Sequence, residues 1–137
     1  MSLNREQVVV EVKQACMKYS ISQAGFVVGY GAAMVMHGLR ETTSDIDADV
    51  TAGTFNRYKN RYETGMGLTG AYVKLTNNID IHVMDAKIEW ELIDGIRVYT
   101  LKQLAKSYEA FMNHPDRNPA KRGQDQATLD KIYALIK

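Results

Sequence analysis

Three aspartates at every second position, Asp45, Asp47 and Asp49, constrain this chain more than any other feature. Successive side chains of a β-strand point to opposite faces of the sheet, so this spacing predicts a strand with the carboxylates on one face and apolar residues on the other. Three like charges on one short strand repel each other, and they lose hydration if they are even partly buried. Because clustered carboxylate oxygens suit Mg²⁺, the pattern indicates that a cation neutralises the set.

A short apolar run and a glycine turn precede the aspartates. Residues 25–28 are predicted to form a strand, Gly29-Tyr30-Gly31 a turn, and residues 32–37 a short apolar helix. A glycine turn that opens a helix can present backbone N–H groups and the positive end of the helix dipole to a phosphate. It can equally be a tight connection that binds no ligand, and an isolated Gly-x-Gly does not decide between the two.

A fourth carboxylate, Asp80, lies in a second apolar strand. Residues 71–75 and 79–84 read as the arms of a hairpin, with Asn77-Asn78 as its turn. In the second arm Asp80 shares a face with His82 and Met84. A charge in so apolar a strand is costly unless a partner or a metal neutralises it.

The remaining segments alternate helices with short connections. Helical periodicity predicts helices over 4–19, 51–62, 101–112 and about 124–136, with Asn4 and Thr100 as N-caps of the first and third. Residues 96–99 are predicted to be a strand, the glycines at 65, 67 and 70 a flexible connection, and residues 113–122, which hold both prolines, a loop.

Composition bounds the class of protein. A chain of 137 residues with 45% hydrophobic and 24% charged residues is expected to form one soluble domain. A net charge of +1 argues against a generally basic nucleic-acid-binding protein, and no apolar run reaches the roughly 20 residues of a membrane span. The single cysteine, Cys16, excludes an intrachain disulfide and fits a cytoplasmic protein. Because Cys16 lies in the apolar stripe of the first helix, we expect it to be buried rather than reactive.

Taken in order, these motifs resemble the DNA polymerase β-like nucleotidyltransferase superfamily. The likeness is greatest to its small bacterial and phage members, the minimal nucleotidyltransferases and the AbiEii-type toxins. The matching residues are Tyr30-Gly31-Ala32-Ala33, His37-Gly38, Arg40-Glu41-Thr42, Asp45-Ile46-Asp47 and Asp80. Tyr30 stands where the family has the first glycine of a pair. A looser likeness includes Lys121-Arg122-x-x-Asp125, so the resemblance covers most of the chain from about residue 25 onward.

The resemblance implies a fold and an activity. The fold would be α/β (α+β), a small mixed β-sheet with flanking helices in a single domain, with a core of about residues 20–99 and a C-terminal helical segment of about 100–137. The activity would be Mg²⁺-dependent transfer of a nucleoside monophosphate from a nucleoside triphosphate (NTP) to an acceptor hydroxyl, with release of pyrophosphate. Two Mg²⁺ ions are expected, with Mn²⁺ as a substitute.

The resemblance also implies roles for individual residues. Asp45, Asp47 and Asp80 would hold the metals, and Asp80 would in addition accept the proton of the acceptor. Residues expected to contact the nucleotide are Gly29, Tyr30, Gly31, Ala32, Arg40, Thr42, Ser44 and Lys121. For Arg40 a salt bridge to Glu41 or to a nearby aspartate is an equal alternative to phosphate binding. Asp49 is expected to support the metal ligands or to be solvated.

The resemblance leaves the acceptor open. The acceptor could be a protein, a tRNA or a small molecule, and so short a chain could need a protein partner or a second copy to complete the acceptor site. No membrane association is expected.

Two other classes of function stay open. The alternative to an enzyme is a non-catalytic interaction module, an antitoxin or a regulatory subunit, which Tyr30 in the glycine motif favours. A purely structural domain with solvated aspartates is the third hypothesis.

Overall fold

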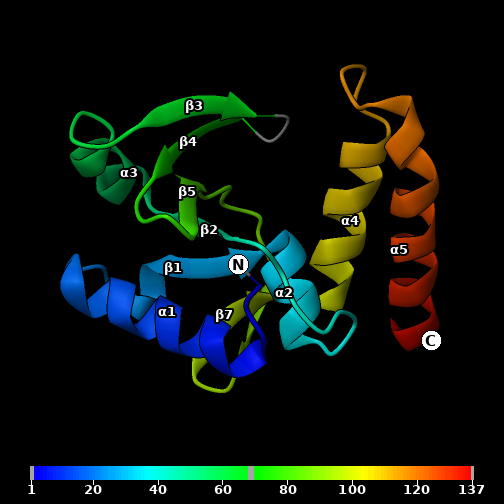
Figure 1. Cartoon of the computed structure of the whole chain (residues 1–137), viewed down its shortest axis with the longest axis horizontal. Helices are drawn as coiled ribbons and strands as arrows, with labels where there is room; N and C mark the ends of the chain where they lie inside the picture. The colour runs from blue at the N-terminus through cyan, green and yellow to red at the C-terminus, as the bar shows by residue number, and fades with distance from the viewer. Residues whose placement is uncertain (1, 68–69, 137) are drawn as a thin grey trace.

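A seven-stranded mixed sheet forms the centre of the computed structural model, which describes residues 2–67 and 70–136 (Figure 1). The strand order is β3-β4-β5-β2-β1-β7-β6. The strands are β1 (Phe26–Gly29), β2 (Ile46–Val50), β3 (Thr64–Gly67), β4 (Gly70–Lys74), β5 (Ile79–Val83), β6 (Trp90–Ile93) and β7 (Ile96–Tyr99). The α-helices are α1 (Arg5–Lys18), α2 (Tyr30–Met36), α3 (Ala52–Tyr58), α4 (Leu101–Met112) and α5 (Arg122–Ile136), with 3₁₀ turns at Gln23–Gly25 (η1) and Pro119–Lys121 (η2). The predicted α/β fold with a small mixed sheet is confirmed.

The first helix begins and packs as its sequence predicts. Asn4 accepts a hydrogen bond from the backbone N–H of Gln7, and the Gln7 side chain accepts one from the backbone N–H of Asn4. This reciprocal capping satisfies donors that the first helical turn leaves free. Cys16 is buried together with Val8 and Val12 on one side of α1, so the expectation of a packed cysteine is confirmed.

Burial of Cys16 predicts slow chemistry at its thiol. Loss of solvation raises the pKa of this thiol to about 11. The thiolate is the reactive form, and two pKa units correspond to about a hundredfold less of it. We therefore expect native protein at pH 8 to react with a thiol reagent at least about a hundredfold more slowly than protein unfolded in denaturant. The chain has one cysteine, so labelling followed by mass spectrometry reports on this site alone. Equal rates would contradict the packing of α1 on the core.

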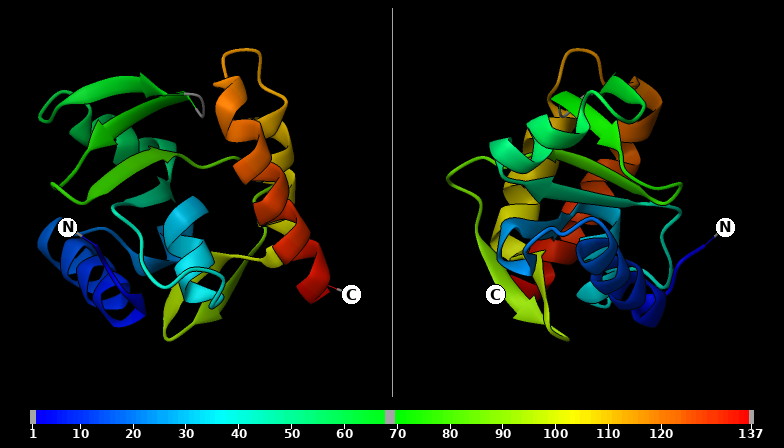
Figure 2. Two further views of the ribbon diagram at one scale, coloured as in Figure 1. Left: turned by 45° about the vertical axis from the view of Figure 1, so that its right-hand side comes forward. Right: turned by 90° about the vertical axis from the view of Figure 1, so that its left-hand side faces the viewer.

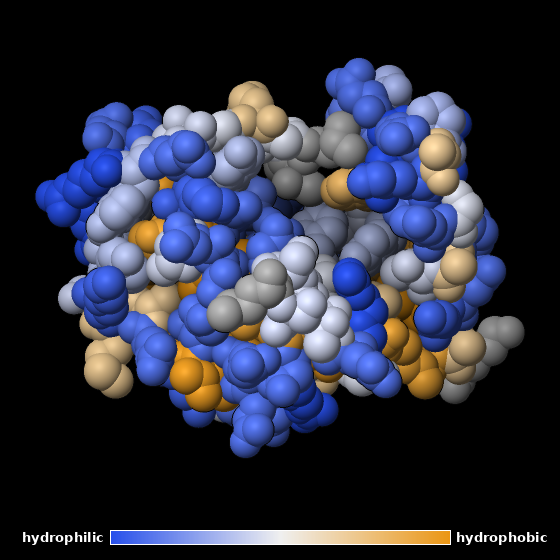
Figure 3. Space-filling model, in the orientation of Figure 1, coloured by the Kyte–Doolittle hydropathy of each residue, from blue (hydrophilic) through white to orange (hydrophobic). Residues whose placement is uncertain are grey.

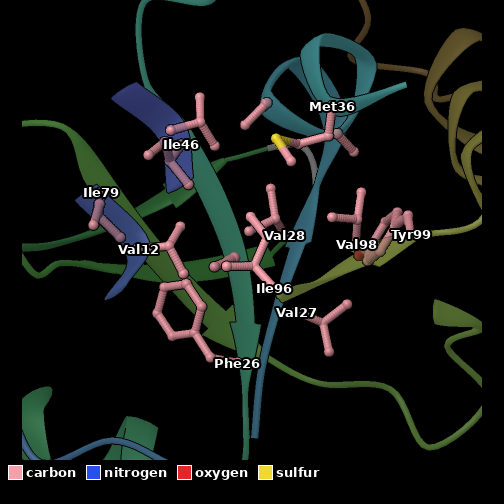
Figure 4. Close-up of a cluster of buried hydrophobic side chains, with 14 of the residues drawn as sticks. Val12, Phe26, Val27, Val28, Met36, Ile46, Ile79, Ile96, Val98 and Tyr99 are labelled. Atoms are coloured by element: carbon pink, nitrogen blue, oxygen red, sulfur yellow. The ribbon is translucent and has the colours of Figure 1, made fainter. Parts of the chain in front are cut away.

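The core lies where the central strands meet α1 and α2 (Figure 4). Every residue of β1 is buried, and on β2 and β5 the apolar side chains that alternate with the carboxylates are fully buried, except for Val83 at the end of β5, which is exposed. These apolar residues are Ile46, Ala48, Val50, Ile79 and Ile81. Burial of a large aliphatic side chain contributes about 1.5–3 kcal/mol, so this face fixes the register of both strands. The opposite face of β2 and β5 carries the polar side chains.

The last two helices form an antiparallel pair beside the sheet (Figure 2). Thr100 caps α4 by accepting a hydrogen bond from the backbone N–H of Gln103, as predicted. Helix α4 packs against α5 along its length and also contacts α2 and β7. The C-terminal helical segment therefore forms a wall beside the polar face of the sheet.

Several predicted boundaries were wrong. The glycine-rich stretch expected to be a flexible connection is largely the hairpin of β3 and β4, although its residues 68 and 69 lie outside the described part of the chain. Strand β6 was missed; it pairs with β7 across the turn Asp94-Gly95, where both residues have positive φ. Helix α3 ends at Tyr58 rather than at residue 62, α2 begins at Tyr30, and η2 lies in the predicted loop.

The described helices are all too short or too polar to cross a membrane.

Candidate active site

Strand pairing brings two of the predicted carboxylates side by side. Strand β2 runs parallel to β5, and the register places Asp47 directly opposite Asp80. Directly opposed residues point to the same face of a sheet, so both carboxylates lie on the polar face. Both side chains are partly buried, with 32% of the Asp47 side chain and 20% of the Asp80 side chain exposed. This pair is the centre of the candidate site.

The third predicted ligand, Asp45, lies just before the strand. Strand β2 begins at Ile46, so Asp45 belongs to the preceding loop and is exposed. Partial burial, followed by the charge of Asp47, raises the pKa of its carboxyl. Across residues 2–67 and 70–136, no three or more histidine, cysteine, aspartate or glutamate side chains lie close enough together to enclose a metal ion.

Two basic side chains of the chain itself face the carboxylate pair. The Lys74 ammonium lies 3.9 Å from Oδ1 of Asp80, across the antiparallel pairing of β4 and β5. The imidazole Nε2 of His82 lies 3.2 Å from Oδ1 of Asp47. Burial lowers the pKa of His82, but the hydrogen bond and charge of Asp47, with the charges of Asp49 and Asp80, outweigh burial and raise it. Part of the negative charge that a metal was expected to neutralise is therefore balanced by side chains of the protein itself.

The donor set nonetheless fits a hard divalent cation. Oδ1 of Asp80 is buried and accepts no hydrogen bond from the described residues, and its contact with Lys74 is too long to be one. Burial is the main cause of the raised pKa of Asp80, and Lys74 opposes that rise. Mg²⁺ is commonly held by one or two carboxylates together with substrate phosphates and water. The pair of Asp47 and Asp80 meets this requirement without a third protein ligand.

Asp49 has a structural partner rather than a solvated environment. Its carboxylate is buried and accepts a hydrogen bond from the phenol of Tyr99 at the end of β7. Burial raises the pKa of Asp49 to about 6, and burial and the charge of Asp49 raise the pKa of Tyr99 in turn. Asp49 therefore ties β2 to β7 on the same face of the sheet as the carboxylate pair, and the alternative of a solvated Asp49 is wrong.

The glycine turn fits closely against Tyr99. Gly29 pairs with Asp47 in the antiparallel register of β1 and β2, and a Cβ built on Gly29 would lie 2.8 Å from the Tyr99 ring. Tyr30 follows with φ of +50°, a left-handed conformation that glycine adopts without strain. The Tyr30 ring packs on those of Tyr99, Tyr108 and Phe111, with centroids 5.8–5.9 Å away. Aromatic packing therefore offsets the strain of a tyrosine at this position.

Replacement of Gly29 tests this close approach. We expect Gly29→Ala to lower the free energy of unfolding by about 1–3 kcal/mol, because the added methyl group forces the Tyr99 ring to move. The measurement is urea unfolding followed by circular dichroism. Gly53→Ala is the matched control: its Cβ meets nothing within 4 Å, so this change in α3 should stabilise by a few tenths of a kcal/mol to about 1 kcal/mol. Equal stability of the two variants would contradict the observed packing.

The loop after α2 folds back over Gly31. A Cβ on Gly31 would lie 2.8 Å from Oγ1 of Thr43 and 3.0 Å from Nη1 of Arg40. The Arg40 charge also opposes the rise in the pKa of Asp45. Gly31 and Arg40 therefore lie close together, and the charge of Arg40 acts on Asp45. In this loop Thr43 is the buried residue, and it donates a hydrogen bond to the carbonyl of Asp45.

The other predicted nucleotide contacts are less well placed. Thr42 and Ser44 flank Thr43 and are exposed, while Ala32 is fully buried in α2 and presents no side chain to a ligand. Lys121 is exposed at the end of η2, before α5, and not on the carboxylate strands.

A pocket of about 350 Å³ lies between the polar face of the sheet and α4. Asp49 and His82 contribute from the sheet, Tyr30 from the start of α2, and Ser107 and Phe111 from α4. The space-filling view shows this side hollowed between the β3–β4 hairpin and the α4–α5 pair (Figure 3). Asp49 and His82, which share the polar face with the carboxylate pair, therefore line a cavity large enough for part of a small molecule, whereas Asp47 and Asp80 do not line it.

Three residues of the site were not predicted to act there. The alternation of β5 placed His82 on the face of Asp80, which was the available signal for it. For Lys74 the signal was its place in the preceding hairpin arm, but its pairing with Asp80 depends on the turn geometry. Tyr99 carried no signal, because nothing in the sequence links the end of β7 to Asp49.

Comparison with known proteins identifies the fold. No family model matches the chain, and no curated protein matches it in sequence. Among solved structures, the crystal structure of the Megavirus polyadenylate synthase is similar, with 17% sequence identity and a TM-score of 0.56. The match covers 94% of this chain and 32% of the viral one, so this chain spans about a third of that protein's length. The protein therefore has a nucleotidyltransferase-like fold.

Proposed function

We propose that the protein is a metal-dependent nucleotidyltransferase, which transfers a nucleoside monophosphate from an NTP to an acceptor hydroxyl and releases pyrophosphate. The observation that carries this proposal is the register that sets Asp47 opposite Asp80 on the polar face, with Gly29 opposite Asp47 on the other side. Two carboxylates beside a glycine turn form a site for a divalent cation next to a site for phosphates.

Asp47 and Asp80 would hold Mg²⁺, or Mn²⁺ in its place, and Asp45 would contribute from the loop when the nucleotide is bound. A bound ion would stabilise the charge that develops on the phosphate and on the entering and leaving oxygens. Asp80 would accept the proton of the acceptor, because its carboxyl is the more buried of the pair and has a raised pKa.

Two cationic side chains would bind the phosphates. Arg40 lies against Gly31 at the start of α2, and its planar guanidinium suits phosphate oxygens. Lys74 lies on the other side of the pair, near Asp80, and its flexible ammonium can turn towards an incoming anion. Helix α2 has only seven residues, so these side chains rather than its dipole would supply most of the positive charge.

The likeness to a polyadenylate synthase supports the reaction class, because polyadenylate synthesis transfers a nucleoside monophosphate to a hydroxyl. It supports no particular acceptor for this chain. A protein, a tRNA or a small molecule would fit the chemistry. A protein partner or a second copy of the chain would complete the acceptor site.

A thermal-shift panel tests this function. Wild type and Asp47→Ala are melted with each of the four NTPs, with and without Mg²⁺. A bound ligand stabilises the folded state by mass action, so one or more NTPs should raise the midpoint only with metal and only in wild type. That result would also name the donor. No shift with any NTP, or an equal shift in Asp47→Ala, would contradict the proposal.

The second candidate is a non-catalytic interaction module that keeps the fold, an antitoxin or a regulatory subunit. The contact of Lys74 with Asp80 favours it, because it balances part of the negative charge without a metal. For such a module, an Asp45→Asn/Asp47→Asn double variant would retain binding to its protein partner, and wild type would show no metal-dependent NTP binding. Loss of partner binding in the double variant would speak against it.

A further inference from the structure

His82 contacts one carboxylate of the candidate site, that of Asp47. His82 pairs with Asp49, two residues further along the strands than the pair of Asp47 and Asp80. Its side chain is only 12% exposed, against 32% for that of Asp47, and its ring centroid lies 6.2 Å from that of Tyr72. A buried imidazole packed beside an aromatic ring has little freedom to turn, so it provides a fixed donor to the more mobile carboxylate.

The hydrogen bond between His82 and Asp47 uses only one of the two carboxylate oxygens of Asp47. Nε2 of His82 lies 3.2 Å from Oδ1, and a carboxylate oxygen can only accept, so Nε2 carries the proton of this hydrogen bond. Both the neutral and the charged imidazole can donate from Nε2, so the contact requires no particular charge state. The χ2 torsion of an aspartate is otherwise broad. A hydrogen bond to one oxygen fixes the plane of the carboxylate and leaves Oδ2 as a ligand.

We infer that His82 is a positioning residue of the metal site: it donates a hydrogen bond to Oδ1 of Asp47 and thereby orients Oδ2 for a divalent cation. This inference rests on the proposed function. Groups that hydrogen-bond to a metal ligand reduce the entropy lost when the ion binds, and removing one typically costs 10–100-fold in metal affinity. Asp80 has no equivalent donor among the described residues within hydrogen-bond distance of its Oδ1, so the support is specific to Asp47.

Mn²⁺ binding, measured by electron paramagnetic resonance on the full chain without nucleotide, tests this role. We expect His82→Leu to weaken Mn²⁺ binding by about 10–100-fold. His82→Gln should recover most of the affinity, because its amide N–H can donate from nearly the same position as Nε2. His114→Leu is the matched control, because it removes another histidine of the same pocket. Nδ1 of His114 accepts a hydrogen bond from the backbone N–H of Asp116 and does not contact the carboxylate pair. Circular dichroism and the thermal midpoint verify the fold of each variant.

The outcomes separate this inference from the proposed function. If wild type binds no Mn²⁺ without nucleotide, this inference is overturned, whereas the proposed function, in which substrate phosphates complete the metal site, is tested separately by the thermal-shift panel. If wild type binds Mn²⁺ and His82→Leu binds it equally well, only the positioning role is overturned. Electron spin-echo spectra of Mn²⁺-loaded wild type provide a test that does not depend on whether a variant folds. The absence of a coupling from a directly bonded nitrogen supports positioning, and its presence would make His82 a ligand and overturn the inference.

Discussion

Asp47→Asn is expected to raise the dissociation constant of the Mg²⁺–NTP complex by about a hundredfold, which corresponds to about 2.7 kcal/mol. The change keeps the size of the side chain but removes the charge that faces Asp80 and His82. An amide oxygen is a weaker ligand for Mg²⁺ than a carboxylate. Isothermal titration calorimetry with the NTP identified by the thermal-shift panel measures the change.

The matched control for this prediction is Asp94→Asn. Asp94 is exposed in the β6–β7 turn and pairs with Arg5, away from the candidate site. Asparagine also tolerates the positive φ at this position. The same chemical change should therefore leave NTP binding unchanged. If Asp47→Asn bound the Mg²⁺–NTP complex as tightly as wild type and Asp94→Asn, Asp47 would not be a metal ligand.

Asp125→Asn is expected to lower the free energy of unfolding by about 3 kcal/mol, because it leaves a largely buried arginine, with 14% of its side chain exposed, without its counter-charge. Asp125 is 3% exposed and accepts two hydrogen bonds from the Arg117 guanidinium, at 2.7 and 2.9 Å. Arg117 also lies over the Phe111 ring, 4.1 Å from its centroid. This buried pair ties the loop after α4 to α5, so its loss should loosen the wall beside the candidate site.

The Asp94→Asn variant is also the control for the effect of burial on the strength of an ion pair. Arg5 and Asp94 form an ion pair at 2.8 Å, but about half of each side chain is exposed. Exposed pairs are screened by water and salt, so breaking this one should not change stability measurably. Urea unfolding of both variants at pH 7 makes the comparison. Equal destabilisation by the two variants would contradict the burial of Arg117 and Asp125.

The sequence allowed the carboxylate pair to be predicted but not all of its surroundings. Alternation in β2 and β5 identified the polar faces, and resemblance to a known family related Asp80 to Asp47. The contact between Lys74 and Asp80 was harder to predict because it depends on register. A two-residue turn at Asn77-Asn78 would set Leu75 opposite Asp80, whereas the observed hairpin sets Lys74 there. A shift of one residue exchanges the faces of a strand, and periodicity alone does not detect it.

The sequence patterns also failed to predict the short strand β6 and the strained backbone at Tyr30. Strand β6 has four largely exposed residues and no strong alternation, although the Asp94-Gly95 turn after it is a typical hairpin signal. At Tyr30, the sequence reveals neither the positive φ nor the three aromatic rings from β7 and α4 that pack around the tyrosine. Contacts between distant segments depend on tertiary packing, which local periodicity does not specify.

The metal position itself tests the account most directly. A crystal of the wild-type protein soaked with Mn²⁺ and a non-hydrolysable NTP analogue would be measured at a wavelength where manganese scatters anomalously. The account predicts an anomalous peak about 2.0–2.3 Å from carboxylate oxygens of both Asp47 and Asp80, with the phosphates of the analogue beside it. Bound nucleotide without such a peak, or manganese bound only elsewhere, would contradict the central claim that this carboxylate pair is a metal site for nucleotidyl transfer.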